Sequence, residues 1–146
     1  MQHQAHEPLT FGIAHPDVTY IPRPGAYALV LRDDGMLAVV RNFLGLFLPG
    51  GGIEQGETDE QALTREIAEE CAYHADMLGY IGAATEYVRV GTTDRGQLKQ
   101  CVFYRARFTA PLHTPVEDGH ELVWVSPEEA MKTLYLACHR WVVERM

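Results

Sequence analysis

Long hydrophobic runs are absent from this chain. No apolar stretch approaches the roughly 20 residues that a membrane-spanning helix requires, and residues 1–10 lack the basic start and apolar core of a secretory signal. We therefore expect no membrane association and a cytoplasmic protein.

Cysteines are also few. Cys71, Cys101 and Cys138 are odd in number and show no Cys-x-x-Cys spacing. This pattern suggests neither a disulfide framework nor a zinc site. We expect all three thiols to be reduced and packed in the interior rather than catalytic.

Basic residues are outnumbered. The chain has 12 Lys and Arg against 20 Asp and Glu, a net charge of −8. This charge argues against nucleic acid or an anionic membrane as a partner. It does not exclude a small anionic substrate, because divalent metal bound to part of the acidic groups would reverse the local field.

The remaining composition is that of one globular domain over residues 1–146, without repeats or linkers. Segments 26–31 and 36–41 flank an Arg-Asp-Asp-Gly turn at 32–35, which predicts an antiparallel hairpin. Further strands are predicted at 43–48, 83–90, 98–108 and 121–125. In 98–108, Val102, Tyr104, Ala106 and Phe108 alternate with Phe103, Arg105 and Arg107, which predicts one buried face.

Helices are predicted where capping residues precede amphipathic segments. Ser126 and Pro127 begin one helix, and another covers 137–145. Strands, a helix, more strands and terminal helices predict an α/β (α+β) fold, with a mixed sheet covered by helices on two faces. Residues 1–17 are either an edge strand or a flexible arm.

The most informative segment lies between Pro49 and Tyr73. It opens with three glycines, which permit left-handed backbone angles and the close approach of a ligand. A helix then begins at Thr58, because Thr58 and Gln61 form a capping box and Asp59 and Glu60 favour the positive end of the helix dipole.

This helix has an apolar face beside an acidic arc. Leu63, Ile67 and Cys71 share the apolar face, and the arc consists of Glu66, Glu69 and Glu70. Such an arc can simply be a solvated face. However, like charges at these spacings repel, with only Arg65 nearby to offset them. A divalent cation removes the conflict, because Mg²⁺ and Mn²⁺ prefer oxygen ligands.

At these residues the chain resembles the Nudix box of MutT-like hydrolases. Seven of its nine defined positions are in register: Gly51, Glu57, Arg65, Glu66, Ile67, Glu69 and Glu70. The departures are Ala72, where the family has glycine, and Tyr73, where it has an aliphatic residue. Neither departure removes a charged position. The resemblance implies a single Nudix hydrolase domain with an α/β/α sandwich fold.

The resemblance also implies roles for individual residues. The glutamates at 66, 69 and 70 would bind Mg²⁺, with Mn²⁺ as a substitute, helped by the backbone carbonyl of Gly50. Glu57 and Arg65 would support catalysis, with Arg65 tethering the acidic side chains. Outside the box, Glu121 is the first candidate for an additional ligand or general base and Glu117 is the reserve, although either can be a plain surface carboxylate. His120 is a weaker candidate.

The implied reaction is hydrolysis of a diphosphate linkage in a small nucleotide by metal-activated water. We expect Arg and aromatic residues to line the substrate pocket, because they pair with phosphates and stack on bases. The candidates are Arg23, Arg41, Tyr20, Tyr87 and Arg89. The substrate is not specified, because the signatures of ADP-ribose, dinucleoside polyphosphate and NADH enzymes are absent.

Two alternatives remain open. One is a non-catalytic nucleotide sensor, which the intact glutamates argue against, and the other is a pyrophosphohydrolase acting on RNA 5′ ends, which the charge of −8 disfavours. Because family members are often dimers, a homodimer is a further option, although no segment identifies an interface.

Overall fold

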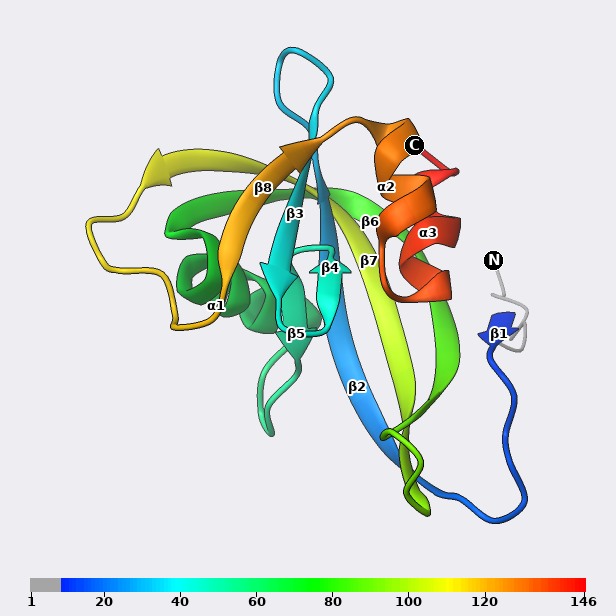
Figure 1. The fold of residues 1–146 in the computed structure, drawn as a ribbon. Helices are drawn as coiled ribbons and strands as arrows, with labels where there is room; N and C mark the ends of the chain where they lie inside the picture. The colour runs from blue at the N-terminus through cyan, green and yellow to red at the C-terminus, as the bar shows by residue number, and fades with distance from the viewer. Residues whose placement is uncertain (1–8) are drawn as a thin grey trace, which may run out of the picture.

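The computed structural model describes residues 9–146 and contains two sheets with helices on either side (Figure 1). The five-stranded sheet has the order β1-β6-β7-β2-β5 and the three-stranded sheet has the order β4-β3-β8. The elements are β1 (Leu9–Phe11), β2 (Thr19–Val30), β3 (Leu37–Asn42), β4 (Gly45–Phe47), β5 (Gly50–Gly52), α1 (Asp59–Cys71), β6 (Tyr73–Arg89), β7 (Arg95–Pro111), β8 (Glu121–Val125), α2 (Pro127–Thr133) and α3 (Ala137–Val143).

The predicted hairpin at 26–41 is wrong in its pairing. The tight turn forms, with the Gly35 amide donating to the Arg32 carbonyl at 2.9 Å. The two strands then diverge into different sheets and meet only at the bridge between Leu31 and Leu37. β2 instead pairs along its length with β7, in parallel. The predicted mixed sheet is the five-stranded one, and β4, β3 and β8 form a separate antiparallel sheet.

The other predicted strands all form, but β6 and β7 are longer than predicted and β4 is shorter than the predicted 43–48. β6 and β7 are long antiparallel neighbours joined by the turn at 90–94, and the last strand has the predicted bounds. β1 runs parallel to β6 at the sheet edge, which confirms the edge-strand alternative for residues 9–11. The part of the N-terminal prediction that concerns residues 1–8 lies outside the described residues.

The five-stranded sheet is covered on both faces (Figure 1). Leu63 and Ile67 of α1 pack in one core cluster with Ala106 of β7. Val142 of α3 packs in a second cluster with Phe103. Phe103 was expected on the exposed face of its strand but is 0% exposed, because the terminal helices cover that face. Within residues 9–146, none of the helices is long and apolar enough to cross a membrane.

Candidate functional site

The predicted start of α1 is confirmed. Thr58 is the N-cap, its side chain accepts from the Gln61 amide, and the Gln61 side chain accepts from the Thr58 amide. Because the capping box fixes where the helix begins, it also fixes the rotation of the carboxylates further along it. Glu66 and Glu70 therefore stand beside the glycine strand β5, and Glu69 lies on the same helix.

Glycine is required at two positions of β5. A Cβ at Gly51 would come within 2.6–2.7 Å of all three carboxylate atoms of Glu66. Gly50 has φ +143° and would push a Cβ into the backbone of β2. Its amide donates a 2.9 Å hydrogen bond to Oε1 of Glu70. The strand thus allows both carboxylates to lie against the backbone.

Glu70 is the most buried carboxylate of the site, with 11% of its side chain exposed. Burial raises the pKa of Glu70 to about 8, against the opposing Gly50 amide and with help from the charges of Glu66, Glu117 and Glu69. Burial likewise raises the pKa of Glu66, an effect that Arg65 partly offsets. The site therefore concentrates negative charge that the protein compensates only in part.

Arg65 compensates the outer side of this cluster. Its guanidinium donates to both oxygens of Glu57 at 2.8 and 2.9 Å, to Glu66 at 3.0 Å, to Glu69 at 3.4 Å and to the Gly52 carbonyl at 3.0 Å. The bond to Arg65 is the largest cause that lowers the pKa of Glu57 to about 2. Both oxygens of Glu57 are committed to this bidentate pair, so its geometry suits a tether better than a metal ligand.

The acidic residues of α1 fit a divalent cation. Within residues 9–146, Glu70 is buried without an arginine or lysine partner, and the carboxylates of Glu66 and Glu69 are held by the same guanidinium nitrogen. Burial first, and then the neighbouring carboxylates, raise the pKa of Glu70, and a hard cation with oxygen ligands would compensate the charge of this buried group. The donor set contains oxygen atoms only, which suits Mg²⁺ or Mn²⁺ rather than a thiophilic metal.

The loop before β8 approaches the acidic cluster at Glu117 and His120. The Glu117 amide donates to the carbonyl of Glu69 at 2.8 Å, and its charge contributes to the raised pKa values of Glu66 and Glu70. His120 Nε2 lies 3.7 Å from Oε2 of Glu70. Glu121, the first candidate from the sequence, instead forms an exposed 3.5 Å pair with Arg41. The structure thus brings Glu117 and His120 to the cluster, whereas Glu121 pairs with Arg41.

Three of the predicted substrate residues are engaged elsewhere. Tyr20 and Tyr87 pack edge to face at 4.9 Å between ring centroids, and the Tyr20 hydroxyl bonds to the backbone of 13–15. Arg89 donates to the carbonyls of Thr93 and Thr92, and these bonds stabilise the turn between β6 and β7. These three side chains therefore make structural contacts near the ends of β2 and β6.

Arg23 and Arg41 each line a cavity near the acidic cluster. Arg41 shares one of about 350 Å³ with His120 and Glu121. Arg23 lines another of about 290 Å³ with Gly52 and Lys99. Sequence reasoning missed Lys99, because its position beside Arg23 depends on the parallel pairing of β2 with β7.

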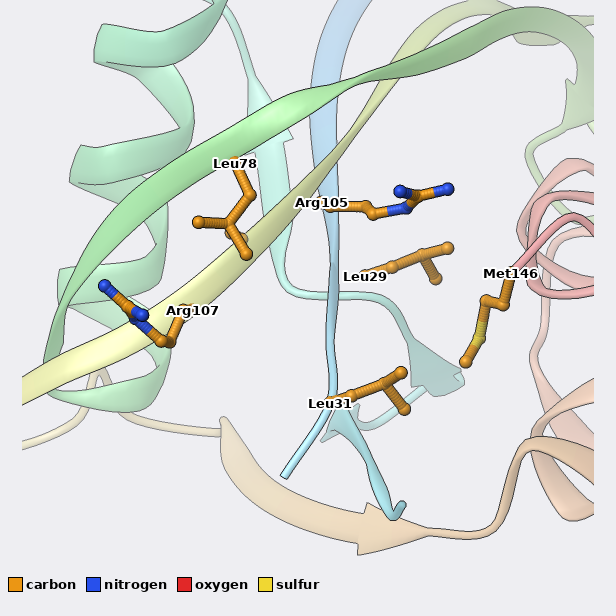
Figure 2. Close-up of a pocket in the computed structure, with 7 residues that line it drawn as sticks. Leu29, Leu31, Leu78, Arg105, Arg107 and Met146 are labelled. Carbon is orange, nitrogen blue, oxygen red and sulfur yellow. The ribbon is translucent and has the colours of Figure 1, made fainter. Parts of the chain in front are cut away.

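Another cavity, of about 490 Å³, is lined by residues of β2 and β7 together with Leu78 and Met146 (Figure 2). Its lining is mostly apolar and includes Leu29, Leu31, Leu78 and Met146, together with Arg105 and Arg107 (Figure 2). Among the residues that the structure describes, those lining it include no acidic side chain. It therefore lacks the oxygen ligands that the predicted chemistry requires.

A second cluster of ligand-type residues lies in the core. All three cysteines are buried and free, as expected. A ring nitrogen of His139 lies within 4.8 Å of the thiols of Cys101 and Cys138. However, Nδ1 of His139 accepts from the Leu48 amide at 3.2 Å, so the proton of the neutral ring is on Nε2. Neither nitrogen then offers a lone pair to a metal, and the cluster packs as part of the core.

Comparison with known proteins agrees with this geometry. The family model described as NUDIX domain matches residues 21–145. The chain is 32% identical over 98 residues to an 8-oxo-(d)GTP phosphatase of Mycolicibacterium smegmatis (67% of this chain, 29% of that protein). It is 40% identical over 105 residues to a putative 8-oxo-dGTP diphosphatase of Bacillus subtilis (70% and 66%). It is 30% identical over 138 residues to an RNA pyrophosphohydrolase of Erythrobacter litoralis (79% and 81%).

Solved structures agree on the fold. A NUDIX hydrolase from Nitrosomonas europaea superposes with a TM-score of 0.69 at 17% identity, covering 84% of this chain and 86% of its own. A MutT NUDIX hydrolase from Burkholderia pseudomallei gives 0.66 at 24% identity, covering 86% and 98%. With a matching family model over most of its length and the box residues gathered around one acidic helix, this chain belongs to the NUDIX domain family.

Proposed function

We propose that this protein hydrolyses the diphosphate linkage of a small nucleotide with the help of a divalent cation. The observation that carries the proposal is the buried carboxylate of Glu70, held by the Gly50 amide beside Glu66 and surrounded by like charge. A solvated acidic face would leave these groups exposed. The names of the relatives, which are phosphatases, diphosphatases or pyrophosphohydrolases, support the same reaction class.

Glu66, Glu69 and Glu70 would hold Mg²⁺ or Mn²⁺, with the Gly50 carbonyl as a further candidate ligand. When bound there, the cation neutralises phosphate oxygens and lowers the pKa of a water molecule. Arg65 keeps Glu66 and Glu69 oriented, and Glu57 anchors Arg65 from the other side. These two residues act by positioning the carboxylates.

The group that receives the proton from water is a separate choice. Glu117 is the better supported candidate, because its charge acts on both Glu66 and Glu70 and its backbone is attached to the end of α1. Glu121 is paired with Arg41 and is 66% exposed. Loss of turnover in Glu117→Gln beside a milder loss in Glu121→Gln would distinguish the two.

The substrate proposed first is a purine nucleoside triphosphate, including an oxidised one, because two of the relatives are named for 8-oxo-dGTP. An RNA 5′ end is the second candidate, since a relative named RNA pyrophosphohydrolase aligns over 79% of this chain. The net charge of −8 favours the small molecule over the polymer.

The test is turnover of a panel with Mg²⁺, with Mn²⁺ and with EDTA. The panel holds dGTP, 8-oxo-dGTP, sugar nucleotides, ADP-ribose, dinucleoside polyphosphates and a 5′-triphosphorylated RNA. We expect metal-dependent release of a nucleoside monophosphate from a triphosphate. If a folded, metal-binding protein cleaves no member of the panel, the sensor alternative replaces the hydrolase.

A further inference from the structure

The cavity of about 290 Å³ beside β5 is lined by two positively charged side chains. Arg23 of β2 and Lys99 of β7 are register partners on adjacent parallel strands, and both line the cavity. Within residues 9–146, neither side chain forms an ion pair or a hydrogen bond. Adjacent cations repel each other, so their arrangement favours an anion between them.

The acidic residue best placed to neutralise Lys99 is committed elsewhere. Glu86 of β6 is the register partner of Lys99 on its other side. The Glu86 carboxylate instead accepts from the amides of Ala137 and Cys138 at 3.2 and 2.8 Å, at the start of α3. Leu136, the N-cap residue of α3, provides no side-chain cap. Glu86 therefore caps the helix, and Lys99 stays half-buried without a counter-charge.

The cavity adjoins the acidic cluster. Gly52 lines it, and the Gly52 carbonyl accepts from Arg65, the residue that holds Glu66. Gly51, the preceding residue, lies directly against the Glu66 carboxylate. A phosphate chain bound at the carboxylates can therefore pass over β5 into the cavity. Its volume is at the low end of the roughly 300–1,000 Å³ of pockets that hold whole small molecules, which suits one group of a substrate.

We propose that Arg23 and Lys99 form a subsite for a phosphate group next to the scissile diphosphate, so that the enzyme selects nucleoside triphosphates over nucleotides that end in a neutral sugar. This inference rests on the proposed function and assigns its substrate class. Phosphate is the chemistry favoured, because the planar guanidinium matches two phosphate oxygens and the ammonium adds a point charge. A neutral sugar would leave both cations desolvated and unpaired.

The first test measures binding. Inorganic tripolyphosphate is titrated by calorimetry, in Mg²⁺, into the wild type, Arg23→Gln, Lys99→Gln and the matched control Arg105→Gln. Arg105 is on the same strand as Lys99 but lines the apolar cavity. We expect each of the first two variants to bind about tenfold more weakly, the loss of one charge-assisted contact. Affinities of both variants equal to that of the wild type would overturn the subsite.

The second test compares substrates that share a base. KM is measured for GTP and GDP-mannose in the same variants. We expect Arg23→Gln and Lys99→Gln to raise KM for GTP at least fivefold more than KM for GDP-mannose. Equal changes for the two substrates would contradict the subsite while leaving the hydrolase intact. Absence of all wild-type turnover would contradict the proposed reaction, and the tripolyphosphate titration would still decide the subsite.

Discussion

Gly51 decides how closely Glu66 can approach β5. The position requires no left-handed backbone, since the constraint is the Glu66 carboxylate within 2.7 Å of where a Cβ would stand. We expect Gly51→Ala to displace that carboxylate and to lower kcat/KM at least tenfold while the protein stays folded. Gly79→Ala is the matched control, because a Cβ there meets no atom within 4 Å. Turnover and circular dichroism are the measurements, and an active Gly51→Ala enzyme would refute the steric argument.

At the acidic helix, residue chemistry and spacing occur together, so the sequence predicted individual residues there. Glu66, Glu69 and Glu70 were predicted on one helix face and Arg65 was predicted to tether acidic side chains; in the structure Arg65 bonds to Glu57, Glu66 and Glu69. Lys99 was not identified. A lysine in a strand has no local signal, and its proximity to Arg23 arises only from strand pairing between distant segments.

At the scale of elements, the end of α1 departs from the family pattern and carries strain. Ala72 adopts φ 57° and is the one described non-glycine residue with a positive φ. A left-handed alanine costs roughly 1 kcal/mol relative to glycine. We expect Ala72→Gly to raise the free energy of unfolding by about 0.5–1 kcal/mol. Ala68→Gly, inside the same helix, should lower it by a similar amount.

Urea denaturation of Ala72→Gly and Ala68→Gly measures the two free energies of unfolding. A destabilised Ala72→Gly would mean that the left-handed conformation is not strained in this context. The sequence analysis had already marked this position, because alanine stands here where the family has glycine.

Element boundaries were predictable where capping residues define them, as at Thr58 and Ser126. The pairing partners of the strands were not predictable from the sequence. The turn at 32–35 forms, but β2 is already paired with β7 and β5 in the other sheet, so a local hairpin signal did not determine the pairing. Phe103 was assigned to the exposed face because alternation describes a strand with one covered face. The terminal helices cover the second face of the strand, and no local sequence pattern indicates that contact.

At the scale of the whole molecule, the buried His139 links stability to pH. It is 0% exposed, and burial, followed by the charges of Lys99 and Arg140, lowers its pKa to about 3. The unfolded chain therefore binds the proton more readily between about pH 3 and 6.5. Stability is full above this window and is lost as the pH falls through it.

For this residue alone the loss between pH 7 and pH 5 is about 2 kcal/mol. We expect His139→Gln, which does not titrate, to show a correspondingly flatter stability profile between these two pH values. Urea unfolding at both pH values gives the comparison, and the other titrating groups cancel in the difference between the two proteins. Parallel profiles would show that His139 is not held neutral.

The central claim is that the carboxylates beside β5 bind the catalytic cation. The most direct measurement is Mg²⁺-dependent release of the nucleoside monophosphate from dGTP by the wild type, Glu70→Gln and Glu60→Gln. Glu60 lies in the exposed first turn of the same helix and is the matched control. We predict turnover that EDTA abolishes, a loss of at least a hundredfold in Glu70→Gln, and near wild-type rates in Glu60→Gln. Equal activity of the wild type and Glu70→Gln would contradict the account.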